Sequence, residues 1–164
     1  MCELHSESIE EANLVDCGHL NLSQTAHLGA FTSLTYDVFM KYLVIGTDAG
    51  EMIIWDMQVG KEVSRRVVDV CGLQQVRFQH SHALITLGRS NLSPIHVFDI
   101  RSCHQEALQP SYKSPLIHQA GVTSFCPHHA REEIMCGTTK GDVVKFDLRI
   151  SSPEVFHLHT GKGE

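Results

Sequence analysis

Short runs of Val, Ile, Leu and aromatic residues alternate along most of the chain with clusters of Gly, Asn, Asp, Ser and Pro. Such a pattern is typical of antiparallel strands joined by tight turns. Residues 46–56, GTDAGEMIIWD, show it most clearly, because a Gly-containing turn leads into an apolar run that ends on Trp-Asp. A strand that is almost wholly apolar needs cover on both faces, so we expect it to lie inside a stack of sheets.

The same pattern returns at a fixed spacing. Residues 27–56 align without a gap on residues 118–147, and seven of the 30 positions are identical. The identical pairs are His27/His118, Thr32/Thr123, Ser33/Ser124, Gly46/Gly137, Thr47/Thr138, Gly50/Gly141 and Asp56/Asp147. The offset leaves room for one more unit of about 45 residues, and periods of about 40–45 residues are those of four-stranded propeller blades.

A divergent middle unit lies between these two repeats. Its first three strands are predicted at residues 75–78, 83–88 and 95–99, and a fourth near 107–109. The fourth strands of the flanking units are predicted at 62–70 and 154–157. The sequence therefore predicts three consecutive units of four strands each.

These residues resemble the WD-repeat (WD40) family, whose members fold as β-propellers of four-stranded blades. The resemblance implies an all-β fold, with blade 1 at 27–70, a divergent blade 2 at 71–117 and blade 3 at 118–158. Residues 1–26 form an acidic lead-in that could supply an outer strand, and residues 159–164 start a truncated further repeat. Closed propellers have about 4 to 8 blades, so three cannot close a ring. We expect a fragment, an incomplete gene model, or a chain whose ring is completed by a partner.

The resemblance also implies a structural hydrogen-bonded chain across each blade. In the family, a His before the first strand, a Ser or Thr in the second, an Asp at the following turn and the Trp of the third are linked. His27, Thr47 and Trp55 match these roles, with Asp48 as the fourth member. The third unit keeps His118 and Thr138 but has Phe146, which cannot donate a hydrogen bond. These residues are predicted to hold blades together and to mark no active site.

Charge and composition narrow the possible functions. The formal net charge is −6, and the first 40 residues carry six acids and no Lys or Arg. No basic stripe is present for a phosphate backbone, which disfavours direct nucleic-acid binding. No apolar run approaches the roughly 20 residues of a membrane span. The six cysteines show no CxxC pair and no signal-peptide pattern precedes them, so we expect an intracellular, reducing setting in which Cys136 acts as a buried hydrophobe.

Catalytic chemistry has little support. The chain shows no Gly-rich phosphate loop, nucleophile elbow or metalloprotease helix, so we expect no enzyme activity and no cofactor. The best metal candidate is residues 126–129, Cys-Pro-His-His, with Cys136 downstream. Zinc sites usually show paired ligands at fixed separations, and this segment follows a first strand, so a polar turn is the favoured interpretation. Residues 80–82 are interpreted in the same way.

Two Asp-x-Arg endings carry the most functional information. Asp99 and Arg101, and Asp147 and Arg149, each follow a third strand that ends in Phe. They resemble the motif by which some WD-repeat proteins dock on the adaptor of a cullin-type ubiquitin ligase, with Phe replacing the usual Trp. The alternative is that each Arg pairs with a neighbouring Asp or a turn carbonyl.

The order of features is similar to that of WD-repeat nucleoporins in the Y-shaped outer-ring complex of the nuclear pore. A turn-to-Trp-Asp hairpin is followed by a divergent unit, a Pro-Leu-Ile-His entry at 115–118 and a repeat that ends in Asp-Leu-Arg. The resemblance implies a non-enzymatic protein-interaction scaffold in the nucleus, with other pore subunits as partners. A substrate receptor of a cullin-type ubiquitin ligase is the alternative.

Overall fold

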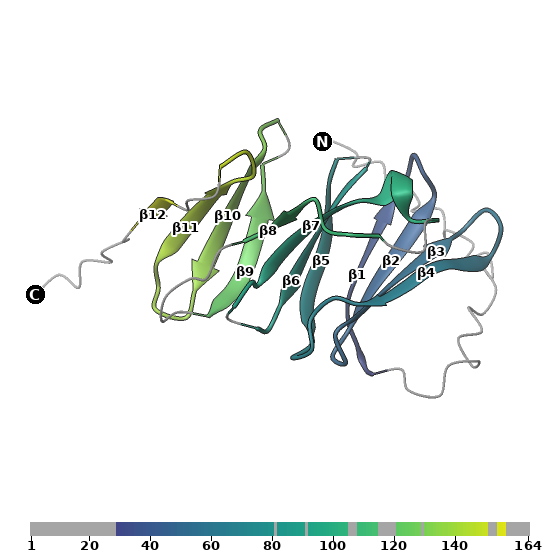
Figure 1. Ribbon diagram of the computed structural model, residues 1–164, viewed down its shortest axis with the longest axis horizontal. Coiled ribbons are helices and arrows are strands. Elements are labelled where there is room, and N and C mark those ends of the chain that lie inside the picture. The colour runs from purple at the N-terminus through teal and green to yellow at the C-terminus, as the bar shows by residue number, and fades with distance from the viewer. Residues whose placement is uncertain are drawn as a thin grey trace, which may run out of the picture.

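The computed structural model describes residues 29–80, 82–90, 92–104, 108–114, 121–128, 130–150 and 154–156, the last three by their backbone alone. Within these residues, twelve strands form three four-stranded antiparallel sheets, which lie side by side as a stack of blades (Figure 1). The predicted all-β fold with three blades is confirmed. None of the helical segments in the described ranges has the length or apolarity required to cross a bilayer.

Each blade is a simple meander in which neighbouring strands along the chain pair in order. Blade 1 contains β1 (Phe31–Asp37), β2 (Tyr42–Thr47), β3 (Glu51–Asp56) and β4 (Lys61–Val67). Blade 2 contains β5 (Leu73–His80), β6 (Ala83–Gly88), β7 (Ile95–Asp99) and β8 (Tyr112–Lys113), with the short 3-10 helix η1 (Ile100–Ser102) after β7. Blade 3 contains β9 (Val122–Pro127), β10 (Glu133–Thr138), β11 (Val143–Asp147) and β12 (Glu154–Phe156).

The sequence repeat is a structural repeat down to single hydrogen bonds. The Thr32 hydroxyl donates to the Gly46 carbonyl at 3.1 Å, and the Thr123 hydroxyl donates to the Gly137 carbonyl at 3.2 Å. Both bonds lie at the β-bulges where the first strand pairs with the second. Blades 1 and 3 therefore share one register at an offset of 91 residues.

The turns that precede the third strands also repeat. Gly50 and Gly141 have φ angles of 82° and 84°, in the left-handed region that a side chain with a Cβ rarely adopts. A Cβ at Gly50 would collide with the backbone carbonyl oxygen of Asp69. The glycines that marked these hairpins in the sequence are required by the backbone.

Blade 2 departs from the prediction in its fourth strand, which was expected near 107–109. Ala107 lies outside the described residues, Leu108 and Gln109 are irregular, and β8 comes later. The backbone amides of Ser111 and Ser114 donate to the carbonyls of Val97 and Ile95, both at 2.8 Å, and these bonds set where pairing with β7 occurs. The location at 107–109 was therefore wrong, because η1 and the loop after it delay the return of the chain.

Two apolar clusters hold the blades together. Between blades 1 and 2 the buried side chains are Tyr42, Val44, Met52, Ile54, Leu73, Val76, Leu84, Phe98, Ile100, Cys103 and Leu108. Between blades 2 and 3 they are Ala83, Ile85, Leu87, Ile95, Val97, Val122, Phe125, Ile134, Cys136, Val144 and Phe146. Burial raises the pKa of the Cys136 thiol to about 12, so its prediction as a buried hydrophobe is confirmed.

Candidate functional site

The two predicted network threonines hold turns. The Thr47 hydroxyl accepts a hydrogen bond from the backbone amide of Glu51 at 3.0 Å. Four residues after Thr138, the backbone amide of Asp142 donates to the Thr138 hydroxyl at 3.2 Å in the same way. Both threonines are buried, so each hydroxyl satisfies an amide of the tight turn that follows it.

The structure forms no direct link between Thr47 and Trp55. Trp55 pairs across the hairpin with Leu43, near the far end of β2. Thr47 lies four residues further along β2, so at about 3.3 Å per residue the two positions are roughly 13 Å apart. The indole nitrogen of Trp55 is buried and has no hydrogen-bond partner among the residues that the structure describes. Thr47 and Trp55 therefore do not contact each other directly, and a chain that joins them through His27 stays a prediction.

Asp48, a further member of the predicted network, lies in the turn after β2. The backbone amide of Asp48 donates to the Ala30 carbonyl at 2.9 Å, and the equivalent bond joins Thr139 to Gly121 at 2.8 Å. These bonds attach each turn to the segment that enters the blade. His27 and His118 lie outside the described residues, so their roles stay predictions.

The predicted docking residues lie together at one end of the stack, where β3, β7 and β11 finish at Asp56, Asp99 and Asp147. We call this the Asp end. Each carboxylate accepts a hydrogen bond from the backbone amide two residues later, at 2.8 Å in blade 1 and 3.0 Å in blades 2 and 3. The aspartates therefore cap the turn in all three blades.

Only blades 2 and 3 add an arginine to this cap. Arg149 binds Asp147 through Nε at 2.8 Å and Nη2 at 2.6 Å. Arg101 binds Asp99 through the same two nitrogens, with Nε at 2.9 Å from Oδ1. The arginine side chains are 64% and 65% exposed, so each guanidinium is fixed by a bidentate pair yet open to solvent.

These pairs set the charge state of the Asp end. The Arg101 side chain lowers the pKa of Asp99 to about 2, and the Arg149 side chain lowers the pKa of Asp147 to about 2. The same bonds raise the pKa of each arginine. Both pairs stay ionised across the physiological range, and they present two oriented guanidinium groups on adjacent blades.

A groove of about 260 Å³ opens beside Arg101, between blades 2 and 3. Its lining includes His80, His82 and Asp99 from blade 2 and Glu132 and Leu148 from blade 3. The His80 and His82 rings lie 4.5 Å apart, and burial lowers the pKa of His80. Acidic and basic groups thus face each other in this groove, which gives it no dominant charge.

Sequence reasoning missed two buried polar residues that hold loops in place, Gln79 between blades 2 and 3 and Asp69 between the β4–β5 connection and the β6–β7 turn. The Gln79 amide donates to the carbonyls of Arg131 at 2.8 Å and His128 at 3.2 Å, across the gap from blade 2 to blade 3. Asp69 accepts from the amides of Cys71 at 2.7 Å and Ser90 at 3.0 Å. The partners of Gln79 lie in a loop of blade 3 that only stacking brings close, whereas the pairing of β5 with β6 brings Ser90 to Asp69.

The metal candidate spans the end of β9, which contains Cys126 and Pro127, and the residues that follow it. Cys126 is exposed near the end of β9, and the imidazole Nδ1 of His128 accepts from the backbone amide of Ala130 at 3.2 Å. His129 lies outside the described residues. Across the residues the structure does describe, no group of three or more His, Cys, Asp or Glu side chains could hold a metal ion.

The fold has clear counterparts among solved structures. The WD40 repeats of RRP9 align with a TM-score of 0.68 and 15% identity, over 83% of this chain and 41% of that chain. The β-propeller domain of Myceliophteria thermophila Cps50 (Swd1) aligns with a TM-score of 0.66 and 13% identity, over 77% and 43%. The computationally designed Ika4 protein aligns with a TM-score of 0.64 and 16% identity, over 80% and 74%.

These comparisons show that the blades have the fold of a WD40 β-propeller. The chain spans less than half the length of each of the two natural propellers. Comparison with protein-family models and with curated proteins gave no match.

Proposed function

We propose that the chain is a non-enzymatic protein-interaction scaffold, and specifically a nucleoporin-like WD-repeat subunit of the nuclear pore. Propellers of this fold commonly present side chains on rigid loops, and function lies in those surfaces. The nuclear location and the pore partners rest on the order of features along the sequence.

One observation carries the scaffold proposal. Val70, in the connection from blade 1 to blade 2, is 89% exposed, and Leu92, in the β6–β7 turn of blade 2, is 74% exposed. Both lie at the end opposite the Asp end. Asp69 joins these two segments, because its carboxylate caps the first and accepts the Ser90 amide of the second at 3.0 Å. Two large apolar side chains are thus held at the surface on an ordered backbone. Such anchors dominate the affinity of protein interfaces.

The test is quantitative affinity purification of the tagged full-length chain from cells. We expect outer-ring pore subunits among its partners and their loss from a Val70→Ser, Leu92→Ser variant. The variant should keep the wild-type melting temperature, since both side chains are exposed. Recovery of no pore subunit by the wild-type chain would overturn the nucleoporin assignment.

The second candidate function is a substrate receptor of a cullin-type ubiquitin ligase. The observation in its favour is the pair of equally exposed, equally oriented guanidinium groups of Arg101 and Arg149 at the Asp end. An Arg101→Ala, Arg149→Ala double variant separates the two functions. Loss of the ligase adaptor alone favours the receptor, whereas an unchanged set of pore subunits favours the scaffold.

A further inference from the structure

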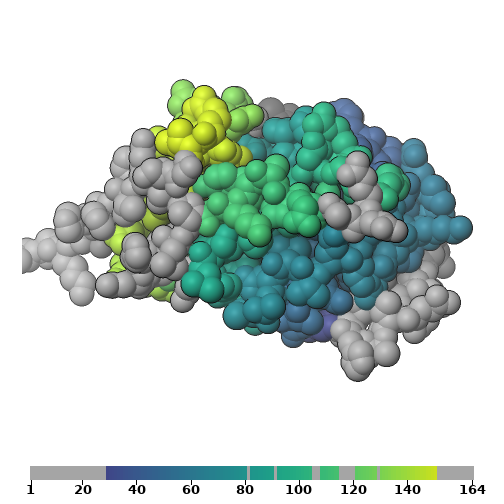
Figure 2. Space-filling model, in the orientation of Figure 1, coloured from purple at the N-terminus to yellow at the C-terminus, as the bar shows by residue number. Residues whose placement is uncertain are grey.

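A second groove, of about 320 Å³, lies between blades 1 and 2 on the outer side of the stack. It is bordered by β4 of blade 1, β8 of blade 2 and the loop that leads into β8. In the space-filling view, residues 108–114 lie in green beside the blue surface of blade 1 (Figure 2). This groove is distinct from the Asp end and from the exposed pair Val70 and Leu92.

The floor of the groove is apolar. Phe98 and Leu108 are buried members of the cluster between blades 1 and 2, and Val68, directly after β4, packs against that cluster. Pro110 adds a further apolar surface in the loop. An apolar side chain of a ligand would find a preformed seat between these four residues.

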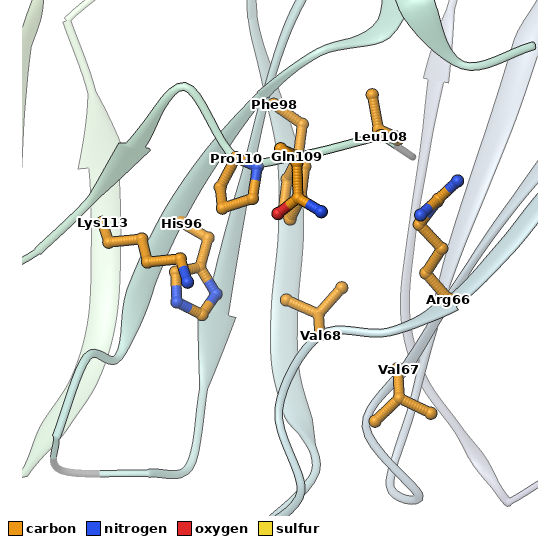
Figure 3. A pocket seen from close by; sticks show the side chains of 9 residues that line it. All are labelled: Arg66, Val67, Val68, His96, Phe98, Leu108, Gln109, Pro110 and Lys113. Atoms are coloured by element: carbon orange, nitrogen blue, oxygen red, sulfur yellow. The ribbon is translucent and has the colours of Figure 1, made fainter. Parts of the chain in front are cut away.

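The sides of the groove are basic. Arg66 pairs with Met52 across the sheet, and Met52 faces blade 2, so the arginine lies over the same face. His96 and Lys113 are cross-strand partners on β7 and β8. Figure 3 shows Lys113 and His96 together on one side of the groove and Arg66 on the other, with Phe98 and Val68 between them.

The charge of this groove is one-sided. Of the described residues that line it, two carry a permanent positive charge and none is acidic. The groove beside Arg101 contains two carboxylates, so it offers no such preference. Burial, and then Lys113, lower the pKa of His96, while the carboxylate of Asp69 acts in the opposite direction.

We propose that this groove binds a short acidic peptide of a partner protein, in which one apolar side chain is flanked on both sides by carboxylates. The apolar side chain would occupy the floor beside Phe98, and the carboxylates would face Arg66 and Lys113. The proposal rests on the scaffold function and names the chemistry of one partner. Complementary charge at a partly desolvated site supplies both specificity and association rate.

The probe is the fluorescein-labelled peptide Ser-Glu-Glu-Leu-Glu-Glu-Ser, titrated with the full purified chain and followed by anisotropy. Lys113→Glu should weaken binding by about tenfold or more, since it replaces attraction by repulsion at the groove wall. Arg66→Gln should weaken binding in the same direction. The matched control Lys61→Glu makes the same charge change on an exposed residue of β4 outside the groove and should leave affinity unchanged.

Peptide controls test the two halves of the proposed motif. Replacing every Glu by Gln, or the Leu by Ser, should each abolish measurable binding. Amide chemical shifts of Val67, Val68 and Gln109 should move on addition of the probe, and amide spectra of the free variants should show that each is folded. Equal binding by Lys113→Glu and Lys61→Glu, or shift changes confined to the Asp end, would overturn the proposal.

One competing occupant is the chain's own acidic segment, residues 1–26, whose acids are Glu3, Glu7, Glu10, Glu11 and Asp16. Replacing these five by their amides should leave probe affinity unchanged if the groove is open to a partner. A several-fold gain in affinity would mean that the segment competes in cis, which overturns the assignment to a partner. Loss of pore subunits without loss of peptide binding would instead reject only the nucleoporin assignment.

Discussion

Blades 1 and 3 share a register but differ on the face that each turns toward the following blade. In blade 1 this face carries Tyr42, Val44, Met52 and Ile54, which are buried against blade 2. The equivalent positions of blade 3 are Glu133, Met135, Val143 and Lys145. Two of the four apolar positions have become charged, and Met135 is exposed.

The opposite faces are alike. Blade 3 packs Ile134, Cys136, Val144 and Phe146 against blade 2. The equivalent side chains of blade 1 are Leu43, Ile45, Ile53 and Trp55, which alternate with the face that contacts blade 2. Ile45, Ile53 and Trp55 are 4%, 0% and 9% exposed. Both blades are therefore built for apolar cover on this side.

The comparison shows that blades with the same strand register can have an outer face suited to water or an outer face that requires cover by protein. In stacked repeats, a polar outer face marks a unit that can meet water, and an apolar one marks a unit that needs a neighbour. The face of blade 3 that points away from blade 2 is polar, with Glu133 and Lys145. The face of blade 1 that points away from blade 2 is apolar, with Ile45, Ile53 and Trp55. The contrast depends on a few side chains, so exchanging or truncating them should change the stability of the two blades by different amounts.

The largest expected effect comes from giving blade 1 the charge that blade 3 carries. Ile54→Lys places an ammonium in the fully buried interface with blade 2 and should cost about 4 kcal/mol or more in unfolding free energy. The reciprocal Lys145→Ile should change it by less than about 1 kcal/mol. Urea denaturation followed by circular dichroism measures both. Similar losses in the two variants would remove the distinction between the faces.

Truncation of the outward faces should have a smaller, still unequal effect. Ile53→Ala removes a fully buried side chain from the outward face of blade 1 and should cost about 2–5 kcal/mol. Met135→Ala removes a partly exposed one from blade 3 and should cost less than about 1 kcal/mol. Thermal unfolding compares the pair. A tolerated Ile53→Ala would show that blade 1 does not depend on cover of this face.

A nearly neutral change is expected where blade 1 is given the aromatic residue of the other two blades. Trp55→Phe shrinks a buried ring, but it also removes an indole N–H that has no partner in the described part of the chain. An unsatisfied buried donor costs about 1–3 kcal/mol, so the two effects should cancel to within about 1 kcal/mol. Trp55→Ala, as control, should cost about 3–5 kcal/mol. A large loss in Trp55→Phe would mean that the N–H is hydrogen-bonded in solution.

The local pattern was sufficient to predict most of the fold. The strands at 83–88 and 95–99 have the predicted bounds, and the repeat from residue 27 predicted the equivalent turns at Gly50 and Gly141. These features depend on residues close together in the chain. Alternating apolar runs specify strands, and a positive φ selects glycine.

The site could be predicted only in part, because its remaining features depend on how blades stack. One interpretation of the Asp-x-Arg spacing, that each Arg pairs with the neighbouring Asp, agrees with the pairs at the Asp end, since both partners belong to one turn. The bonds of Gln79 join segments that only the packing of blade 2 on blade 3 brings together. The chain predicted to join Trp55 to Thr47 stays a prediction, because the register separates the two residues and His27 lies outside the described residues. The groove between β4 and β8 likewise has no signature along the chain.

The smallest expected effect separates blade 3 from blade 1 at the Asp end, where Arg149 has Gln58 as its counterpart. Arg149→Gln should raise the pKa of Asp147 from about 2 toward the ordinary value of about 3.9. The rise should be incomplete, because the backbone amide of residue 149 still donates to the carboxylate. A carboxyl whose pKa is lower in the folded state than in the unfolded state stabilises the fold at pH values above the unfolded pKa, and this stabilisation is lost as the pH falls through about 2. The pair is exposed to solvent, so the substitution should barely change the melting temperature at pH 7. Carboxyl-carbon NMR titration reads both aspartates at once. Asp99, whose own arginine is intact, should stay near 2 as the internal control, and an unshifted Asp147 would show that the backbone bond alone sets its charge.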